Sequence, residues 1–275
     1  MILSTHGIIG SSVTVASGDA DALAFFTAAG ITDTTQKTAV NNLVTDLKAA
    51  NIWTKMKALY PFVGGSASQH RFNLKDPRDL DAAFRLVFNG GWTHSSTGAL
   101  PNGTTGWART YLTPSLNLSN ANFHVSYYSR TDVDNIHVEL GSGDSFGYYS
   151  PHLRLRFGGN QARFICGNTT DYGLPPVTNT DSRGHFIGNI LSTSNRKFYK
   201  NSNIIQTNTS VITNSLYTGE MVLAGYNYSP TSLNVILNSA KESAFASIGD
   251  GLTDGEAAAF YTAVQAYQTT LNRQV

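Results

Sequence analysis

The chain is short of charge and of cysteine, and each shortage removes a class of function. Only 13% of its 275 residues are charged and the formal net charge is +1. Long-range attraction to nucleic acid or to an anionic membrane is therefore not expected. Cys166 is the single cysteine, which excludes an intrachain disulfide and a CxxC metal site. It lies in the strand-like run QARFIC, so we interpret it as a packing residue.

Long apolar runs are missing as well. No segment approaches the ~18 consecutive apolar residues that suggest a membrane-spanning helix. The N-terminal stretch MILSTHGIIGSSVTVASG resembles a signal peptide only superficially, because no Lys or Arg precedes Lys37 and Ser and Thr interrupt its apolar run. The sequence therefore predicts a protein that is made in a cytosol without a signal peptide and does not enter a membrane.

What the chain does have is glycine, small polar residues and aromatics, a composition typical of β-sheets joined by tight turns. From about Gly106 the apolar residues recur with a period of two, as in Phe123–Tyr127 and Leu153–Phe157. Phe198–Tyr199 and Ile204–Ile205 flank Asn201–Ser202, which predicts a hairpin with a two-residue turn. Frequent strands separated by turn signals indicate a sandwich or jelly roll, and a single such domain often reaches this length.

Helical patterns come before and after this β-rich region. We expect an extended arm over residues 1–17, which is either a strand that adds to a neighbouring sheet or a strand or loose tail of its own domain. A helical segment over residues 18–90 follows, and residues 91–275 form the sandwich. Thr253 and Glu256 have the spacing of a capping box and predict a closing C-terminal helix.

Four helical stretches are predicted inside the segment 18–90. The first runs from Asp19 to Ala29 before Gly30, and the second begins at Asp33. An apolar face over Ile52–Leu59 continues the helical pattern until Pro61 ends it. Asp76 and Pro77 predict the start of another helix, which ends at Asn89–Gly91.

Several segments resemble one group of proteins. Ile248–Glu256, which reads IGDGLTDGE, is similar to the closing strand, turn and helix of laminin-G-like jelly rolls, and Lys197–Ile205 is similar to a hairpin of that fold. Lys75–Asp79, Gly90–His94 and Asn179–Gly184 resemble virion structural proteins of tailed bacteriophages. The resemblance covers most of residues 19–275. It implies a mainly β protein with a concanavalin A-like jelly-roll β-sandwich, an N-terminal arm, a small helical segment and a C-terminal helix.

The sequence predicts that the chain is not an enzyme. Some relatives of the fold are glucanases with a Glu-x-Asp carboxylate cluster, and retaining hydrolysis needs two carboxyls about 5–5.5 Å apart. No glutamate here has an acid two residues later; the four are Glu139, Glu220, Glu242 and Glu256. The GxSxG match at Gly143–Gly147 lies between predicted strands, so we interpret it as a hairpin turn and not as a nucleophile elbow.

Two pairs of residues are candidate cation ligands. His137 and Glu139, like Asp132 and Asp134, are two residues apart and would share one side of a strand. Oxygen ligands favour calcium, but two ligands are too few for a site. We therefore expect solvated faces and neither a metal nor another cofactor.

Basic residues form a second candidate site. A two-residue turn at Gly158–Gly159 would set Arg154 opposite Arg163, with Arg156 beside them. Like charges that face each other destabilise a sheet unless something neutralises them. The residues are either neutralised by a loop aspartate or by solvent, or they bind an anion or the carboxylate of a partner.

Aromatic residues near turns are the third candidate. Aromatic faces with Asn neighbours hold sugars in lectins, and the same residues also fill sandwich cores. The residues concerned are Trp92, Trp107, Tyr148, Tyr149, Tyr226 and Tyr228.

Together these patterns favour a structural protein exposed on a phage particle, as a capsid decoration, head fibre or tail component. Its expected partners are other virion proteins and further copies of itself, with a host-surface glycan as a further candidate. Nucleic acid and membrane are not expected partners. The alternatives are a polysaccharide depolymerase and a free lectin-like adhesin.

Overall fold

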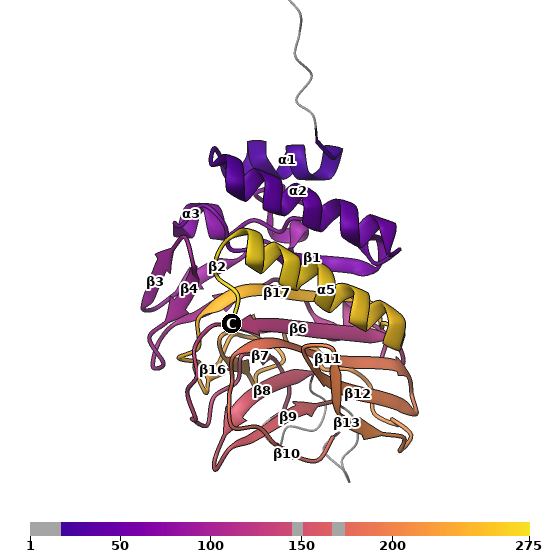
Figure 1. Cartoon of the computed structure of the whole chain (residues 1–275). Coiled ribbons are helices and arrows are strands. Elements are labelled where there is room, and N and C mark those ends of the chain that lie inside the picture. Colours follow the sequence, from indigo (N-terminus) through magenta and orange to yellow (C-terminus); the bar gives the residue numbers. More distant parts are fainter. Residues whose placement is uncertain (1–17, 145–150, 167–173) are drawn as a thin grey trace, which may run out of the picture.

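Three layers make up the residues that the computed structural model describes, which are 18–144, 151–166 and 174–275 (Figure 1). Helices form the first layer, an eight-stranded sheet (the central sheet) the second, and a seven-stranded sheet (the outer sheet) the third. The predicted arm, residues 1–17, lies outside the described residues. The layers confirm the prediction of a mainly β jelly-roll sandwich with a C-terminal helix.

Both sheets are antiparallel. The central sheet runs in the order β13 (Asn203–Asn208), β12 (Asn195–Lys200), β11 (Gly184–Ser192), β6 (Phe123–Ser129), β17 (Ser243–Gly249), β4 (Gly98–Pro101) and β3 (Trp92–Ser95), with β1 (Met56–Tyr60) also paired to β17. The outer sheet runs in the order β10 (Val177–Thr178), β9 (Gln161–Ile165), β8 (His152–Phe157), β7 (Leu140–Gly141), β14 (Val222–Leu223), β5 (Trp107–Arg109) and β2 (Val87–Asn89). A small hairpin consists of β15 (Tyr226–Asn227) and β16 (Val235–Ile236).

The helices lie mainly on the central sheet. They are α1 (Ala20–Ala29), α2 (Thr34–Ala49), α3 (Ala67–His70), α4 (Pro114–Asn117) and α5 (Asp254–Thr270), with 3₁₀ turns η1 (Trp53–Lys55) and η2 (Asp81–Ala83). Helix α5 crosses the central sheet, and α1 and α2 lie farther out beside it (Figure 1). None of the helices among the described residues is long and apolar enough to cross a membrane.

Two apolar cores follow from this layering. Alternate residues of a strand point to opposite faces, so Phe123, Val125 and Tyr127 of β6 enter the core between the two sheets. The opposite side of β6 is buried too, because α5 covers it, and Tyr128 packs in a second core with the helices. The helical layer and the sandwich therefore share one buried interface. The predicted domain boundaries at residues 17 and 90 stay predictions.

Several local predictions are confirmed. Tyr199 pairs with Ile204 and Lys200 with Asn203, which leaves the predicted two-residue turn at Asn201–Ser202. The capping box is complete: the Glu256 backbone N–H donates to Thr253 Oγ1 at 3.2 Å, and the Glu256 carboxylate accepts from the Thr253 backbone N–H at 2.7 Å.

Two of the predicted helices are wrong. Within residues 52–59 the only helical element is the turn η1 (Trp53–Lys55). Met56–Tyr60 is a strand, because it pairs with β17 in the central sheet. The stretch from Asp76 to Asn89 contains the short turn η2 and then strand β2. Phe84 ends that turn with φ of 57°, a left-handed conformation that no helix continues through.

Candidate functional site

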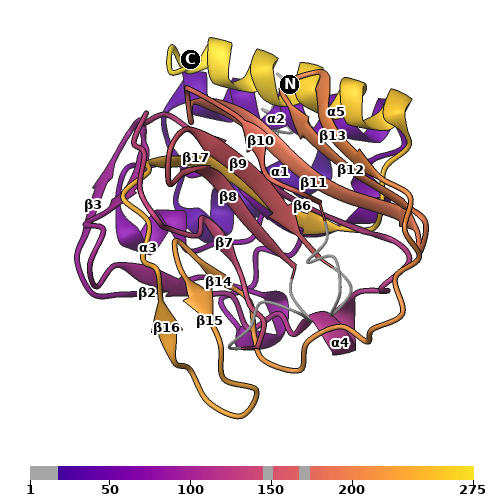
Figure 2. The same cartoon turned by 90° about the horizontal axis from the view of Figure 1, so that it is seen from below.

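The outer face of the outer sheet is the sheet surface that α1, α2 and α5 leave uncovered (Figure 1). Figure 2 shows this side, with β7, β8, β14 and the β15–β16 hairpin toward the viewer. Ala108 of β5 and Leu153 of β8 point into the sandwich core. Arg109 and Arg154, their neighbours in sequence, therefore lie on the outer face.

A groove of about 430 Å³ opens where β5 meets the β15–β16 hairpin. That volume lies within the range of ligand pockets, roughly 300–1,000 Å³. Its lining combines one basic side chain, one acidic side chain and four hydroxyl groups, two of them at the tip of the hairpin: Arg109, Thr113, Thr218, Glu220, Pro230, Thr231, Ser232 and Leu233. The wall therefore offers many hydrogen-bond donors and acceptors within a small space.

Arg109 and Glu220 form a rigid pair at this groove. Arg109 Nε donates to Glu220 Oε2 at 2.7 Å, and Nη2 donates to Oε1 at 2.9 Å. The carboxylate raises the pKa of the Arg109 guanidinium above its ordinary value. The guanidinium also lies 4.1 Å from the centre of the Tyr111 ring, and Tyr111 has φ of 58°. A bulky residue with positive φ is unusual, and here it holds an aromatic face beside a charged pair.

The predicted aromatic residues do not form one platform. The Trp92 indole N–H donates to the backbone oxygens of Asn89 at 3.0 Å and Trp107 at 3.3 Å, which brings the two tryptophans together at a sheet edge. Tyr226 is 5% exposed and donates its hydroxyl to Asp144 O, so its ring is part of the packing. Tyr228 is half-buried next to the hairpin tip of the groove. Tyr148 and Tyr149 lie outside the described residues.

The predicted pairing of Arg154 with Arg163 is confirmed. The turn after it differs from the prediction, because Phe157 pairs with Gln161 and leaves three residues, Gly158–Asn160, between the strands. All three have positive φ, and a register shift separates Arg154 from the end of β8.

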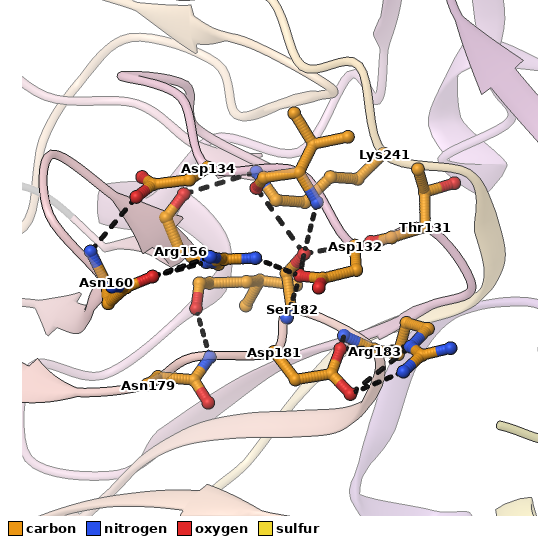
Figure 3. Close-up of polar contacts among 12 residues, drawn as sticks. Thr131, Asp132, Asp134, Arg156, Asn160, Asn179, Asp181, Ser182, Arg183 and Lys241 are labelled. Atoms are coloured by element: carbon orange, nitrogen blue, oxygen red, sulfur yellow. Dashed lines mark hydrogen bonds and ion pairs between the residues drawn. The ribbon is translucent and has the colours of Figure 1, made fainter.

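This shift takes Arg156 away from the other two arginines. Arg156 donates to Asn160 Oδ1 at 2.6 Å through Nη2 and to Asp132 Oδ1 at 2.7 Å through Nη1 (Figure 3). Asp132 also accepts from the Ser182 backbone N–H, and Asp134 accepts from the Asn160 backbone N–H at 3.0 Å. These contacts tie three loops together. Asp132 and Asp134 are both exposed, as predicted, and each also accepts hydrogen bonds from its own chain.

Glu139, another of the four candidate cation ligands, is fully buried. Its Oε1 accepts from Lys241 Nζ at 3.0 Å and its Oε2 accepts from the Leu155 backbone N–H at 2.9 Å. The prediction of a solvated face is wrong for this residue, because Glu139 supports the irregular end of β8. Among the described residues, no group of three or more His, Cys, Asp or Glu side chains is placed to hold a metal ion.

The sequence alone did not identify the groove or one buried histidine. Arg109 and Glu220 are far apart in the chain, and only the pairing of β5 with β14 joins them. His152 shares the outer face with Arg154, and its ring packs against Tyr226 with centres 5.0 Å apart. The only sequence features that pointed to this region were Trp107 and Tyr228, which were predicted as aromatic residues near turns.

Comparison with known proteins supports the fold. The chain is similar to the sialidase of Trypanosoma rangeli in complex with 2,3-difluoro-KDN, with 10% identity, a TM-score of 0.50 and coverage of 82% of this chain and 39% of the sialidase. It is also similar to the binding domain of botulinum neurotoxin serotype D (9% identity, TM-score 0.46, coverage 77% and 52%). A third similar structure is domain 4 of the Geobacillus stearothermophilus GH43 arabinanase AbnA in complex with arabinotriose. It has 12% identity and a TM-score of 0.39, and the match covers 75% of this chain and 98% of that domain. No family model and no curated protein matches the chain.

The likeness to the sialidase shows the fold alone, and the chain spans well under half the length of the sialidase. This likeness supports the β-sandwich part of the resemblance. The prediction that the chain is not an enzyme, made from the missing carboxylate pair, is contradicted, because the chain has the fold of a sialidase. The likeness at 10% identity assigns no reaction to this chain.

Proposed function

We propose that this chain is a carbohydrate-binding β-sandwich protein exposed on a bacteriophage particle, and that the groove at Arg109 and Glu220 holds the sugar. The observation that carries the proposal is the bidentate Arg109–Glu220 pair, which lies against the Tyr111 ring in a hydroxyl-lined groove.

The chemistry of that pair suits a saccharide. Sugar hydroxyls both donate and accept, so a guanidinium fork beside a carboxylate matches them in both roles. The Arg109 guanidinium lies over the Tyr111 ring, which helps to fix the direction in which its remaining N–H groups can donate. Because the two charges neutralise each other, the groove offers polar contacts without a strong field of one sign. The sialidase of similar fold is described with a bound sugar acid, which supports a saccharide as ligand.

The phage part of the proposal is supported by the segments that resemble virion proteins, Lys75–Asp79, Gly90–His94 and Asn179–Gly184. The layering is compatible with it. Helices α1, α2 and α5 lie on the side of the central sheet that faces away from the outer sheet (Figure 1), whereas the groove is lined by residues of the outer sheet and its loops. Attachment through α1, α2 and α5 would therefore leave the groove accessible. Other virion proteins and further copies of this chain are the proposed partners, since particles present such proteins in many copies.

A glycan array followed by calorimetry tests the sugar site. We expect at least one bound glycan, and Arg109→Ala or Glu220→Ala should weaken its affinity at least tenfold. Arg183→Ala is the matched control, because Arg183 forms a similar fork with Asp181 away from the groove. The array eluate is also assayed for released sugars, so that cleavage is detected if it occurs. Equal affinity in all four proteins would refute the site.

Mass spectrometry of purified phage particles tests the location. The proposal predicts peptides of this chain in the particle at a fixed ratio to the major capsid protein. Their absence from intact, infectious particles would remove the phage assignment and leave the sugar site to be judged separately.

A further inference from the structure

Lys241 is a buried amine that the proposed function does not use. It lies just before β17, and its side chain is fully buried, as is that of Glu139 just before β7. Lys241 Nζ donates to Glu139 Oε1 at 3.0 Å and to Asn135 Oδ1 at 3.0 Å. A third, longer contact joins it to the Arg156 backbone oxygen at 3.4 Å (Figure 3). An amine, a carboxylate and a carboxamide therefore meet at one buried point.

These three groups have the chemistry of an amide exchange. A lysine amine is a nucleophile once it is neutral, and burial away from water disfavours both charges of an ion pair. A proton that moves from Lys241 to Glu139 turns two buried charges into two neutral groups. The neutral amine then lies next to the Asn135 carboxamide, because the oxygen that it contacts is bonded to the carbon that it would attack. Fixed proximity of this kind removes a large part of the barrier to a bimolecular step.

The surroundings hold the three groups in place. Glu139 Oε2 accepts from the Leu155 backbone N–H at 2.9 Å, and Oε1 also accepts from the Ser239 hydroxyl at 3.2 Å. The Asn135 backbone oxygen accepts from the His137 backbone N–H at 2.8 Å. Asn135 is only partly buried, so a small leaving group has a path from its carboxamide to solvent.

A second lysine–asparagine contact in the chain lacks the carboxylate. Lys200 Nζ donates to Asn179 Oδ1 at 2.8 Å and to the Asp181 backbone oxygen. The Asp181 carboxylate itself accepts from Arg183. Within the described part of the chain, no carboxylate is hydrogen-bonded to Lys200, so this pair is an internal control for the role of Glu139.

We propose that Lys241 and Asn135 form an intramolecular isopeptide bond, with Glu139 as the catalytic base and acid. Glu139 takes one proton from Nζ, and the neutral Nζ attacks Asn135 Cγ. Glu139 then gives a proton to Nδ2 and takes the second proton from Nζ, so that the Cγ–Nδ2 bond breaks as the Nζ–Cγ bond forms. An ammonium, a carboxylate and a carboxamide become a secondary amide, a carboxylic acid and ammonia. No oxidant or cofactor is needed.

The bond would join two parts of the chain that are 106 positions apart. Asn135 lies in the connection between β6 of the central sheet and β7 of the outer sheet, and Lys241 leads into β17 of the central sheet. The ion pair of Lys241 with Glu139 is the state before the reaction. The product is a covalent tie at the end of the sandwich where β8 departs from regular pairing.

Mass spectrometry of the denatured full-length chain tests whether the bond forms. After prolonged incubation at neutral pH, we expect the loss of one molecule of ammonia. Peptide mapping should find Asn135 and Lys241 in one branched peptide, with Asn179 and Lys200 in separate linear peptides. An unchanged mass would overturn the inference. Ammonia loss confined to a linear peptide with Asn102–Gly103, where succinimide formation also releases ammonia, would overturn it as well.

Three variants test the roles of the residues. Glu139→Gln keeps the shape of the side chain but accepts no proton, so the bond should form at least about 100-fold more slowly. Asn135→Ala changes a partly exposed residue and should fold without a branched peptide. Asn179→Ala is the matched control and should keep the branched peptide in full.

Circular dichroism checks that each variant is folded. A wild-type rate in folded Glu139→Gln would contradict the role of Glu139. If Glu139→Gln does not fold, Asn135→Ala decides, because a branched peptide at Lys241 in that variant would overturn the inference.

Discussion

The buried pair of Glu139 and Lys241 shows how single residues hold one end of the sandwich. Both side chains are fully buried. Lys241 Nζ also donates to Asn135 Oδ1 at 3.0 Å. Glu139 accepts from the backbone N–H of Leu155. Leu155 lies in the irregular end of β8, where regular pairing with β9 is interrupted. The pair therefore takes the place of ladder hydrogen bonds at the position where β8 departs from regular pairing.

Replacing one member of this pair should be strongly destabilising. Lys241→Met leaves Glu139 as an unpaired buried charge, and we expect a loss of about 3–5 kcal/mol in the free energy of unfolding, measured in urea. Lys197→Met is the control, because Lys197 pairs with Asp254, which is 60% exposed, and should cost under about 1 kcal/mol. Similar losses for the two variants would contradict this account of the pair.

Single residues also show which parts of the site the sequence could predict. The facing of Arg154 and Arg163 followed from the period of two and one turn. The ion pair of Arg156 with Asp132 could not be predicted in this way, because three positive-φ residues in the turn and a register shift in β8 change the direction of the Arg156 side chain. The Arg109–Glu220 pair depends on strands far apart in the chain, and no local pattern carries that information.

At the scale of elements, locally encoded structure was predicted well. The capping box at Thr253 and the hairpin at Asn201–Ser202 depend on residues within a few positions of each other. The region 52–89 was predicted wrongly. Its apolar residues recur at spacings of three and four, which suit a helix, but part of this region joins a sheet instead. Met56–Tyr60 is a strand because β17, nearly 200 residues later in the chain, offers an edge for it.

The two sheets approach each other closely at a glycine, and this gives an element-scale prediction. A Cβ on Gly188 of β11 would lie 2.3 Å from the Phe164 ring of β9. Gly188→Ala should therefore push the sheets apart or displace the ring, at a cost of about 1–3 kcal/mol.

The matched control is Gly255→Ala, in the first turn of α5, where an added Cβ meets nothing within 4 Å. It should raise stability by about 0.5–1 kcal/mol, because alanine favours a helix. Thermal and urea unfolding measure both variants. A neutral Gly188→Ala would show that the sheets are farther apart there than described.

At the scale of the whole molecule, burial of histidines makes stability depend on pH. Among the histidines that the structure describes, four are almost fully buried: His70, His124, His152 and His185. Desolvation lowers the pKa of His70 and His185 to about 3 and that of His124 to about 4. In the unfolded chain each has a pKa of about 6.5, so between about pH 6.5 and pH 4 the unfolded state binds more protons than the native state.

Stability should therefore be highest above about pH 6.5 and fall as the pH drops, by about 1.4 kcal/mol per pH unit for each such histidine. Urea unfolding at constant ionic strength from pH 8 to pH 5 measures the slope. His185→Leu should reduce the slope by one histidine, since neither His185 ring nitrogen has a partner in the described structure. A stability that stays constant from pH 7 to pH 5 would contradict the burial of these rings.

The central claim for the whole molecule is that the groove at Arg109 and Glu220 binds a saccharide. A crystal structure of the chain with the tightest glycan from the array tests it most directly. The predicted result is sugar density in that groove, with ring hydroxyls within hydrogen-bond distance of the Arg109 guanidinium and the Glu220 carboxylate. Density on another surface, with the groove filled only by water, would contradict the claim.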